Sequence, residues 1–102
     1  MKENENNKVI VRTERAGVFF GEIEKQENTP AGVLVKIKDC RRIWYWDGAA
    51  SLSELAVSGT RHPSRCKFPP AVKSMTVCGV IEIIPCTVEA VASIESVPVW
   101  RA

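Results

Sequence analysis

Two adjacent arginines followed by two tryptophans are the residues of this chain whose types best suit binding chemistry. They are Arg41, Arg42, Trp44 and Trp46, and they share one strand-like run. A guanidinium group holds phosphate oxygens in a two-pronged fork, and an indole ring stacks on a nucleobase. The pattern predicts a site for a small ligand that carries both a phosphate and a base.

The same residues also have a purely structural interpretation. The tryptophans would fill the core, while the arginines would pair across the sheet with Glu22, Glu24 or Asp47. Period-two alternation along a strand puts one arginine on each face. Both faces of this run are amphipathic, so both interpretations stay open.

A basic loop at residues 60–71 follows, in which three prolines break any ladder of backbone hydrogen bonds. Its Arg61 and Arg65 are expected to close over the ligand. The only histidine, His62, lies near Cys66, and neighbouring cations would lower the pKa of that thiol. No third residue that would orient such a pair is evident, so we expect a solvated loop rather than a nucleophilic site.

No pattern of a conventional enzyme or metal site is present. The carboxylates have no diagnostic spacing, and Glu82, which interrupts an apolar run, is expected to pair with an arginine. Phosphate-binding glycine patterns are absent. The four cysteines have no close pair of the kind that zinc sites use, so we expect reduced, buried thiols. We therefore expect no enzymatic activity, no cofactor and no metal.

Length and composition favour one small folded domain. The chain has 102 residues, of which 45% are hydrophobic and 25% charged, and it has room for a single core. We expect a loose tail at residues 1–7 and a domain at 8–102. The formal charge of +2 is too small for nucleic-acid binding by electrostatics alone. No run resembles a signal peptide or a membrane span, so we expect a cytoplasmic protein without membrane contact.

The first half of the chain predicts a meander of strands. β-branched and aromatic residues with period-two alternation indicate strands at 8–13, 18–24 and 33–38. Turn-forming residues occupy 26–32. A fourth strand is predicted over Arg41–Trp46.

The second half adds two short helices and a buried strand. Ser51 and Glu54 fit a capping box for a helix at 52–58, residues 77–84 read as one apolar strand, and Thr87 can cap a second helix with Val88, Val91 and Ile94 inward. The fold class is α+β, with a strongly bent antiparallel sheet or small open barrel of about five to six strands and two short helices.

Three motifs carry a resemblance to a known family. They are Arg12-x-x-x-Ala16-Gly17-Val18-x-x-Gly21, Arg41-Arg42-x-Trp44-x-Trp46-x-Gly48-Ala49 and Ile84-Pro85-Cys86-Thr87. The chain resembles, over nearly its whole length after residue 8, a family of small proteins encoded by phages and prophages. The resemblance implies a genomic context rather than a mechanism.

Compact phage accessory proteins often sequester a host signal or block a host protein. We therefore expect a homo-oligomeric anti-defence protein that captures a phosphorylated small molecule, such as a nucleotide immune signal. The alternative is a protein-interaction module, either a virion component or an inhibitor of a host protein, with Trp100 and Val99 as anchors. A third possibility, nucleic-acid binding through a face of Lys36, Lys38, Arg41 and Arg42, is disfavoured by the weak overall charge.

Overall fold

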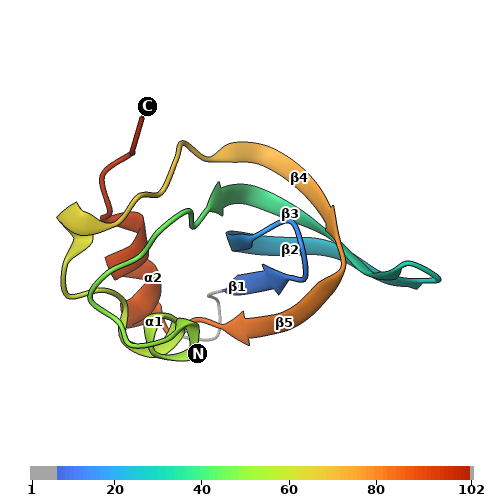
Figure 1. Cartoon of the computed structure of the whole chain (residues 1–102), viewed down its shortest axis with the longest axis horizontal. Helices are drawn as coiled ribbons and strands as arrows, with labels where there is room; N and C mark the ends of the chain where they lie inside the picture. The colour runs from blue at the N-terminus through green and yellow to red at the C-terminus, as the bar shows by residue number, and fades with distance from the viewer. Residues whose placement is uncertain (1–6, 102) are drawn as a thin grey trace.

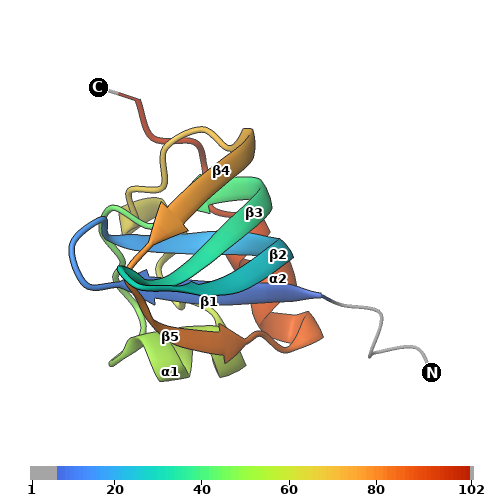
Figure 2. The ribbon, with the colours of Figure 1, turned by 90° about the vertical axis from the view of Figure 1, so that its right-hand side faces the viewer.

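The protein is a five-stranded antiparallel sheet with two helices at one end. The computed structural model describes residues 7–101, so nearly all of the predicted tail at 1–7 lies outside the described residues. The elements are β1 (Lys8–Thr13), β2 (Val18–Thr29), β3 (Gly32–Arg42), α1 (Leu52–Ser58), β4 (Val72–Cys78), β5 (Val80–Pro85) and α2 (Val88–Glu95). The strand order is β4-β3-β2-β1-β5, with every neighbouring pair antiparallel (Figure 2). The predicted α+β class with a bent open sheet is confirmed.

Gly79 makes the sheet curl. It is the single residue between β4 and β5, yet these two strands form opposite edges of the sheet (Figure 1). Its φ of 76° lies in a region that glycine adopts without steric cost. The prediction of one strand over 77–84 is therefore wrong, because the chain bends at Gly79 and pairs with β3 on one side and with β1 on the other.

Both faces of the central strands are buried. On β1, Ile10 faces the helices, while its neighbour Val11 faces the inside of the curl. The helix-facing cluster includes Phe20, Leu55, Phe68, Ala90 and Ile94, and the cluster inside the curl includes Phe19, Val35, Ile37, Cys40 and Val77. Alternation along each strand thus serves two cores, with the helices covering one open end of the curl (Figure 1).

The third strand is longer than predicted, and the predicted fourth strand does not form. β2 ends at Thr29 and β3 begins at Gly32, so the turn between them is shorter than the predicted turn at 26–32. The chain continues in β3 through Asp39, whose φ is 52°, to Arg42. Residues 43–46 then leave the sheet, and only Tyr45 makes an isolated bridge there. The two arginines therefore end the third strand instead of beginning a fourth.

N-terminal capping residues set where both helices begin, as the sequence predicts. The Ser51 hydroxyl accepts a hydrogen bond from the Glu54 amide at 3.1 Å, and the Thr87 hydroxyl accepts one from the Ala90 amide at 3.0 Å. One detail of the second helix is wrong. Val88 is exposed, whereas Ile94 is buried as predicted, together with Ala90.

Arg41 joins the end of β3 to the C-terminal segment. It is only 8% exposed, and its guanidinium donates to five backbone carbonyls, those of Phe68, Pro69, Ile94, Val97 and Pro98, at 2.8–3.3 Å. Its carbon Cζ also lies 5.3 Å from the centroid of the Phe68 ring. Burial lowers the pKa of Arg41, but an arginine starts so far above neutrality that it remains charged. A buried cation is tolerated here because neutral carbonyl oxygens surround it.

Replacing Arg41 by methionine should strongly destabilise the fold. The carbonyls of Pro69, Val97 and Pro98 would lose the donor that Arg41 supplies, and we expect a loss of about 3 kcal/mol or more in the free energy of unfolding. Arg42→Met is the matched control. Among the described residues, Arg42 donates a single hydrogen bond, to the Ala16 carbonyl. Its loss should lower the free energy of unfolding by about 1 kcal/mol. Urea denaturation of both variants measures the difference, and equal losses would show that Arg41 is not the anchor.

Candidate functional site

A cavity of about 290 Å³ brings three of the predicted ligand-binding residues together. Arg42, Trp44 and Trp46 line it, together with Arg15 from the turn between β1 and β2. The end of β3 and the segment after it supply one wall, and the β1–β2 turn supplies the other. Arg15 was not predicted as a site residue, because nothing in the sequence tells how close the turn comes to the end of β3.

The guanidinium of Arg42 is held in place from two sides. Its Nη1 donates to the Ala16 carbonyl at 2.7 Å, and its Cζ lies 4.7 Å from the centroid of the Phe19 ring. A Cβ atom at Gly17 would come within 3.2 Å of Nη1, and the φ of Gly17 is 111°. The turn therefore accepts the arginine where a larger residue would crowd it. The other guanidinium nitrogens of Arg42 have no hydrogen-bond partner among the described residues.

Among the described residues, no carboxylate lies within ion-pair distance of either cavity arginine, Arg15 or Arg42. The structural alternative of pairing with Glu22, Glu24 or Asp47 is therefore not realised there, and Glu24 pairs with Lys36 and Asp47 with His62 instead. The cavity therefore carries net positive charge and suits an anion.

The two tryptophans differ in their degree of burial. Trp44 is 63% exposed, so it does not fill the core. Trp46 is half-buried and packs against the helix-facing core cluster. One indole is thus fixed by the fold while the other projects toward solvent, and both offer aromatic surface to the cavity.

The three remaining arginines of the prediction lie elsewhere. Arg41 is the buried anchor described above, and its donors are committed to carbonyls. Arg61 is exposed and pairs with Glu54 at 3.9 Å. Arg65 ends a 3-10 turn at Pro63–Arg65. None of them lines the cavity.

A second cavity, of about 510 Å³, adjoins the first. The two share Val18 and Trp46, and the second extends to the ion pair of Arg12 and Glu82 and to the start of α1 at Ser51–Ser53. Arg12 Nε and Glu82 Oε1 lie 3.1 Å apart, which confirms the expected pairing of Glu82 with an arginine. The position of this pair beside Trp46 was not predictable from the sequence, because the curl of the sheet decides it.

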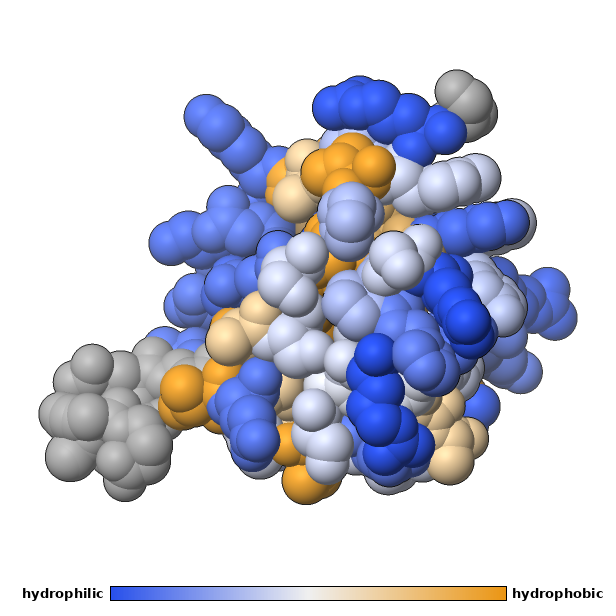
Figure 3. All heavy atoms as spheres, turned by 90° about the vertical axis from the view of Figure 1, so that its left-hand side faces the viewer, coloured by the Kyte–Doolittle hydropathy of each residue, from blue (hydrophilic) through white to orange (hydrophobic). Residues whose placement is uncertain are grey.

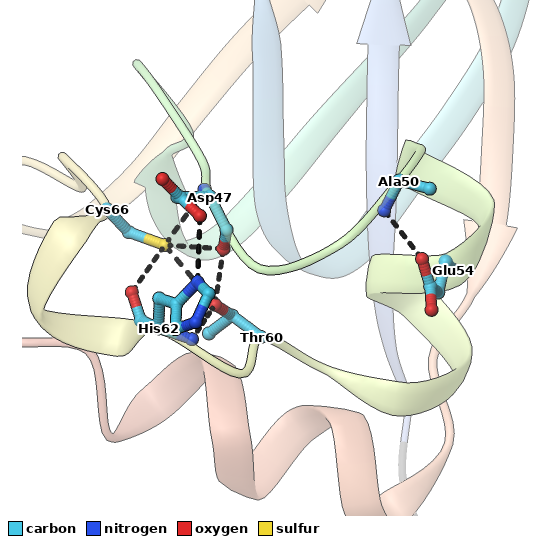
Figure 4. A network of polar contacts seen from close by, with 6 residues as sticks. All are labelled: Asp47, Ala50, Glu54, Thr60, His62 and Cys66. Atoms are coloured by element: carbon cyan, nitrogen blue, oxygen red, sulfur yellow. Dashed lines mark hydrogen bonds and ion pairs between the residues drawn. The ribbon is translucent and has the colours of Figure 1, made fainter.

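The loop after Trp46 is locked by a polar network (Figure 4). The carboxylate of Asp47 lies 2.9 Å from Nδ1 of His62, and the Thr60 hydroxyl donates to the Asp47 carbonyl at 2.5 Å. Cys66 Sγ contacts the Asp47 backbone at 3.5 Å, the Thr60 hydroxyl at 3.6 Å and the His62 carbonyl at 3.7 Å. Among the contacts within the described residues, none joins Cys66 Sγ to the imidazole ring of His62.

This network is structural in its geometry. Asp47 is the residue that orients His62. The sequence did not reveal this role because the two residues are far apart in the chain. Cys66, however, is buried and directs its sulfur at backbone groups. A nucleophilic pair needs the thiol within reach of the imidazole nitrogen, and this arrangement instead fixes the backbone next to Trp46.

The cysteines otherwise behave as small core residues. All four lie within the described residues and form no disulfide bond. Burial raises the pKa of Cys40 and of Cys86 to about 11, so both stay protonated at neutral pH. Cys78 is exposed, contrary to the expectation that all four would be buried.

The predicted anchors Trp100 and Val99 belong to a separate surface. Lys67 Nζ lies 5.9 Å from the centroid of Tyr45 and 5.6 Å from that of Trp100. Val99 bridges to Phe68 and is 49% exposed. On the face seen in Figure 3, apolar residues are scattered among polar ones.

Neither a metal cluster nor a membrane-spanning helix is found in the described part of the chain. Among residues 7–101, no group of three or more histidine, cysteine or acidic residues is arranged to hold a metal ion. None of the helices in the described part of the chain is both long and apolar enough to cross a membrane.

The chain belongs to a family defined by a domain of unknown function, DUF6948, whose model matches residues 6–94. The match covers both cavities and excludes only the C-terminal segment with Trp100 and the first residues. No curated protein and no solved structure matches the chain. The phage origin implied by the resemblance stays a prediction.

The Asp47–His62 contact should make stability depend on pH in acid. The hydrogen bond from His62 lowers the pKa of Asp47 below its usual value. A carboxyl with a lowered folded-state pKa stabilises the fold above its unfolded pKa of about 4, and this contribution is lost as the pH falls through the lowered value. The melting-temperature gap between wild type and Asp47→Asn should therefore be present at neutral pH and shrink below about pH 4. Asp39→Asn is the control, and a gap independent of pH would contradict the assignment.

Proposed function

We propose that this DUF6948 protein is a binding protein that captures a phosphorylated small molecule in the cavity of Arg15, Arg42, Trp44 and Trp46. The observation that supports the proposal most directly is that one cavity is lined by aromatic surface and by two arginines that have no carboxylate partner among the described residues. Guanidinium groups recognise phosphate by paired hydrogen bonds. Aromatic faces beside them suit a base.

The orientation of Arg42 favours binding. Its planar group already rests on the Phe19 ring and is tied to the Ala16 carbonyl. An arginine fixed before the ligand arrives loses less conformational entropy on binding than a free one. The Nη1 nitrogen holds the turn, which leaves the remaining donors for an anion in the cavity.

The proposal includes capture without chemical conversion. The polar network of Asp47, His62 and Cys66 points the thiol at backbone groups, and this arrangement favours a structural role over a catalytic one. A protein of this kind would act as a sponge for a phosphorylated signal. We extend the proposal to a phage-encoded, cytoplasmic homo-oligomer that removes a nucleotide immune signal of the host.

Arg42→Ala tests the capture of phosphorylated ligands. Isothermal titration with AMP, GMP, CMP and UMP should show binding of at least one of them by the wild type. The variant should bind that nucleotide about tenfold or more weakly, because charge-assisted hydrogen bonds to phosphate are lost. Arg61→Ala is the matched control, since Arg61 is an exposed arginine outside the cavity. Equal affinity of wild type and Arg42→Ala would contradict the proposal.

The alternative of a protein-interaction module has support at the C-terminal segment. Lys67 lies over the ring of Trp100 and also over that of Tyr45. Val99, the neighbour of Trp100 in the chain, is exposed. Large aromatic residues with exposed apolar neighbours are typical of interface anchors. For this alternative we take the partner to be a second copy of the chain.

Trp100→Ala tests that alternative. Light scattering after size-exclusion chromatography should show an oligomer for the wild type and a monomer for the variant. Val57→Ala, which shortens an exposed apolar residue on α1, should leave the oligomer intact. A monomeric wild type would contradict an interface between copies.

A further inference from the structure

We infer that the ligand is a guanine nucleotide that lies across Trp46, with its phosphate at Arg42 and its base in the second cavity against Arg12 and Glu82. This inference rests on the proposed function and specifies the ligand class. It adds a second subsite to the same groove, and it assigns to Arg12 and Glu82 the choice of base.

The two adjoining cavities are called the groove here. Val18 and Trp46 line both of them, so a ligand that lies along Trp46 would contact both. The cationic end holds Arg15 and Arg42, and the other end holds one cation and one anion. A phosphate fits the first end, whereas a neutral group with both donors and acceptors fits the second.

Arg12 and Glu82 are fixed as a pair by the sheet. They lie opposite each other in the register of β1 and β5, and Nε of the arginine contacts Oε1 of the glutamate at 3.1 Å. Their side chains remain 49% and 42% exposed. The contact engages Nε and one carboxylate oxygen, so the Nη nitrogens and the second oxygen have no partner among the described residues.

Guanine matches this order of donor and acceptor. Its O6 and N7 accept hydrogen bonds, which suits the guanidinium of Arg12. The neighbouring N1–H and the exocyclic amino group donate, which suits the carboxylate of Glu82. Adenine presents an amino donor where guanine has O6 and a bare nitrogen where guanine has N1–H. It would set a donor against the guanidinium and a lone pair against the carboxylate.

Pyrimidines match less well. Uracil offers the acceptor and the donor in the right order, but its next group is a carbonyl that would face the carboxylate. Cytosine reverses the first two groups as adenine does. A purine also covers more of the Trp46 ring than a pyrimidine does, which adds stacking. The expected order of affinity is therefore GMP first, with the other three nucleotides clearly weaker.

The experiment is isothermal titration of GMP, AMP, CMP and UMP into wild type, Glu82→Gln and Ser53→Trp. Wild type should bind GMP about tenfold or more tightly than AMP, the difference that one well-placed pair of base contacts supplies. Glu82→Gln should bring GMP to within about threefold of AMP by removing that contact. Ser53 is exposed at the rim of the second cavity, so a tryptophan there should weaken GMP while the cavity at Arg42 stays open.

Two controls keep the result decisive. Glu24→Gln removes a carboxylate on β2 that lies outside both cavities and should retain the preference for GMP. Melting curves of each variant check folding, and Ser53→Trp supplies the answer if Glu82→Gln unfolds.

Each outcome has a definite meaning. Equal affinities for the four nucleotides, all lost in Arg42→Ala, would overturn the guanine inference and leave the proposed function standing. A GMP preference that persists in both Glu82→Gln and Ser53→Trp would also overturn it. Absence of binding by all four nucleotides would overturn the inference and the proposed function together.

Discussion

The hydrogen bonds of the buried Arg41 guanidinium are the interaction on which the helix-covered end of the molecule depends. The guanidinium gathers carbonyl oxygens from two segments that are distant from β3 in the chain, residues 68–69 and 94–98. The carbonyls lie near the end of α2 and the end of the basic loop. Those of Phe68 and Ile94 also accept from the backbone amides of Trp100 and Val97, whereas for those of Pro69, Val97 and Pro98 the donor among the described residues is Arg41. One side chain thus connects the sheet to the C-terminal segment.

The same strand end makes the candidate site. Successive residues of a strand point to opposite faces, so the inward direction of Arg41 sends Arg42 toward the turn between β1 and β2. There its guanidinium meets the Phe19 ring and the Ala16 carbonyl. The structural arginine and the proposed binding arginine are therefore consequences of one alternation, and a shift of register by one residue would exchange them.

Sequence reasoning succeeded where the signal is local. The caps at Ser51 and Thr87 involve side chains three residues from their partners, and both helices begin where those residues predict. It failed where distant strands decide the outcome. Alternation showed that Arg41 and Arg42 face apart but not which one is buried, since the segments that cover Arg41 come much later in the chain. In the same way, Arg12 and Glu82 meet only because the bend at Gly79 brings β5 beside β1.

The position of Trp46 follows from the network behind it. The next residue, Asp47, is held through its carboxylate by His62 and through its carbonyl by Thr60. Thr60 is in turn tied to Ser93 on α2, whose hydroxyl accepts from the Thr60 amide at 2.9 Å. The loop that carries the tryptophan is therefore braced against a helix, while Arg42 is braced against the sheet. Trp46 and Arg42 are thus both held in place before a ligand binds. Such a site suits a ligand of defined shape, because little conformational entropy is lost on binding.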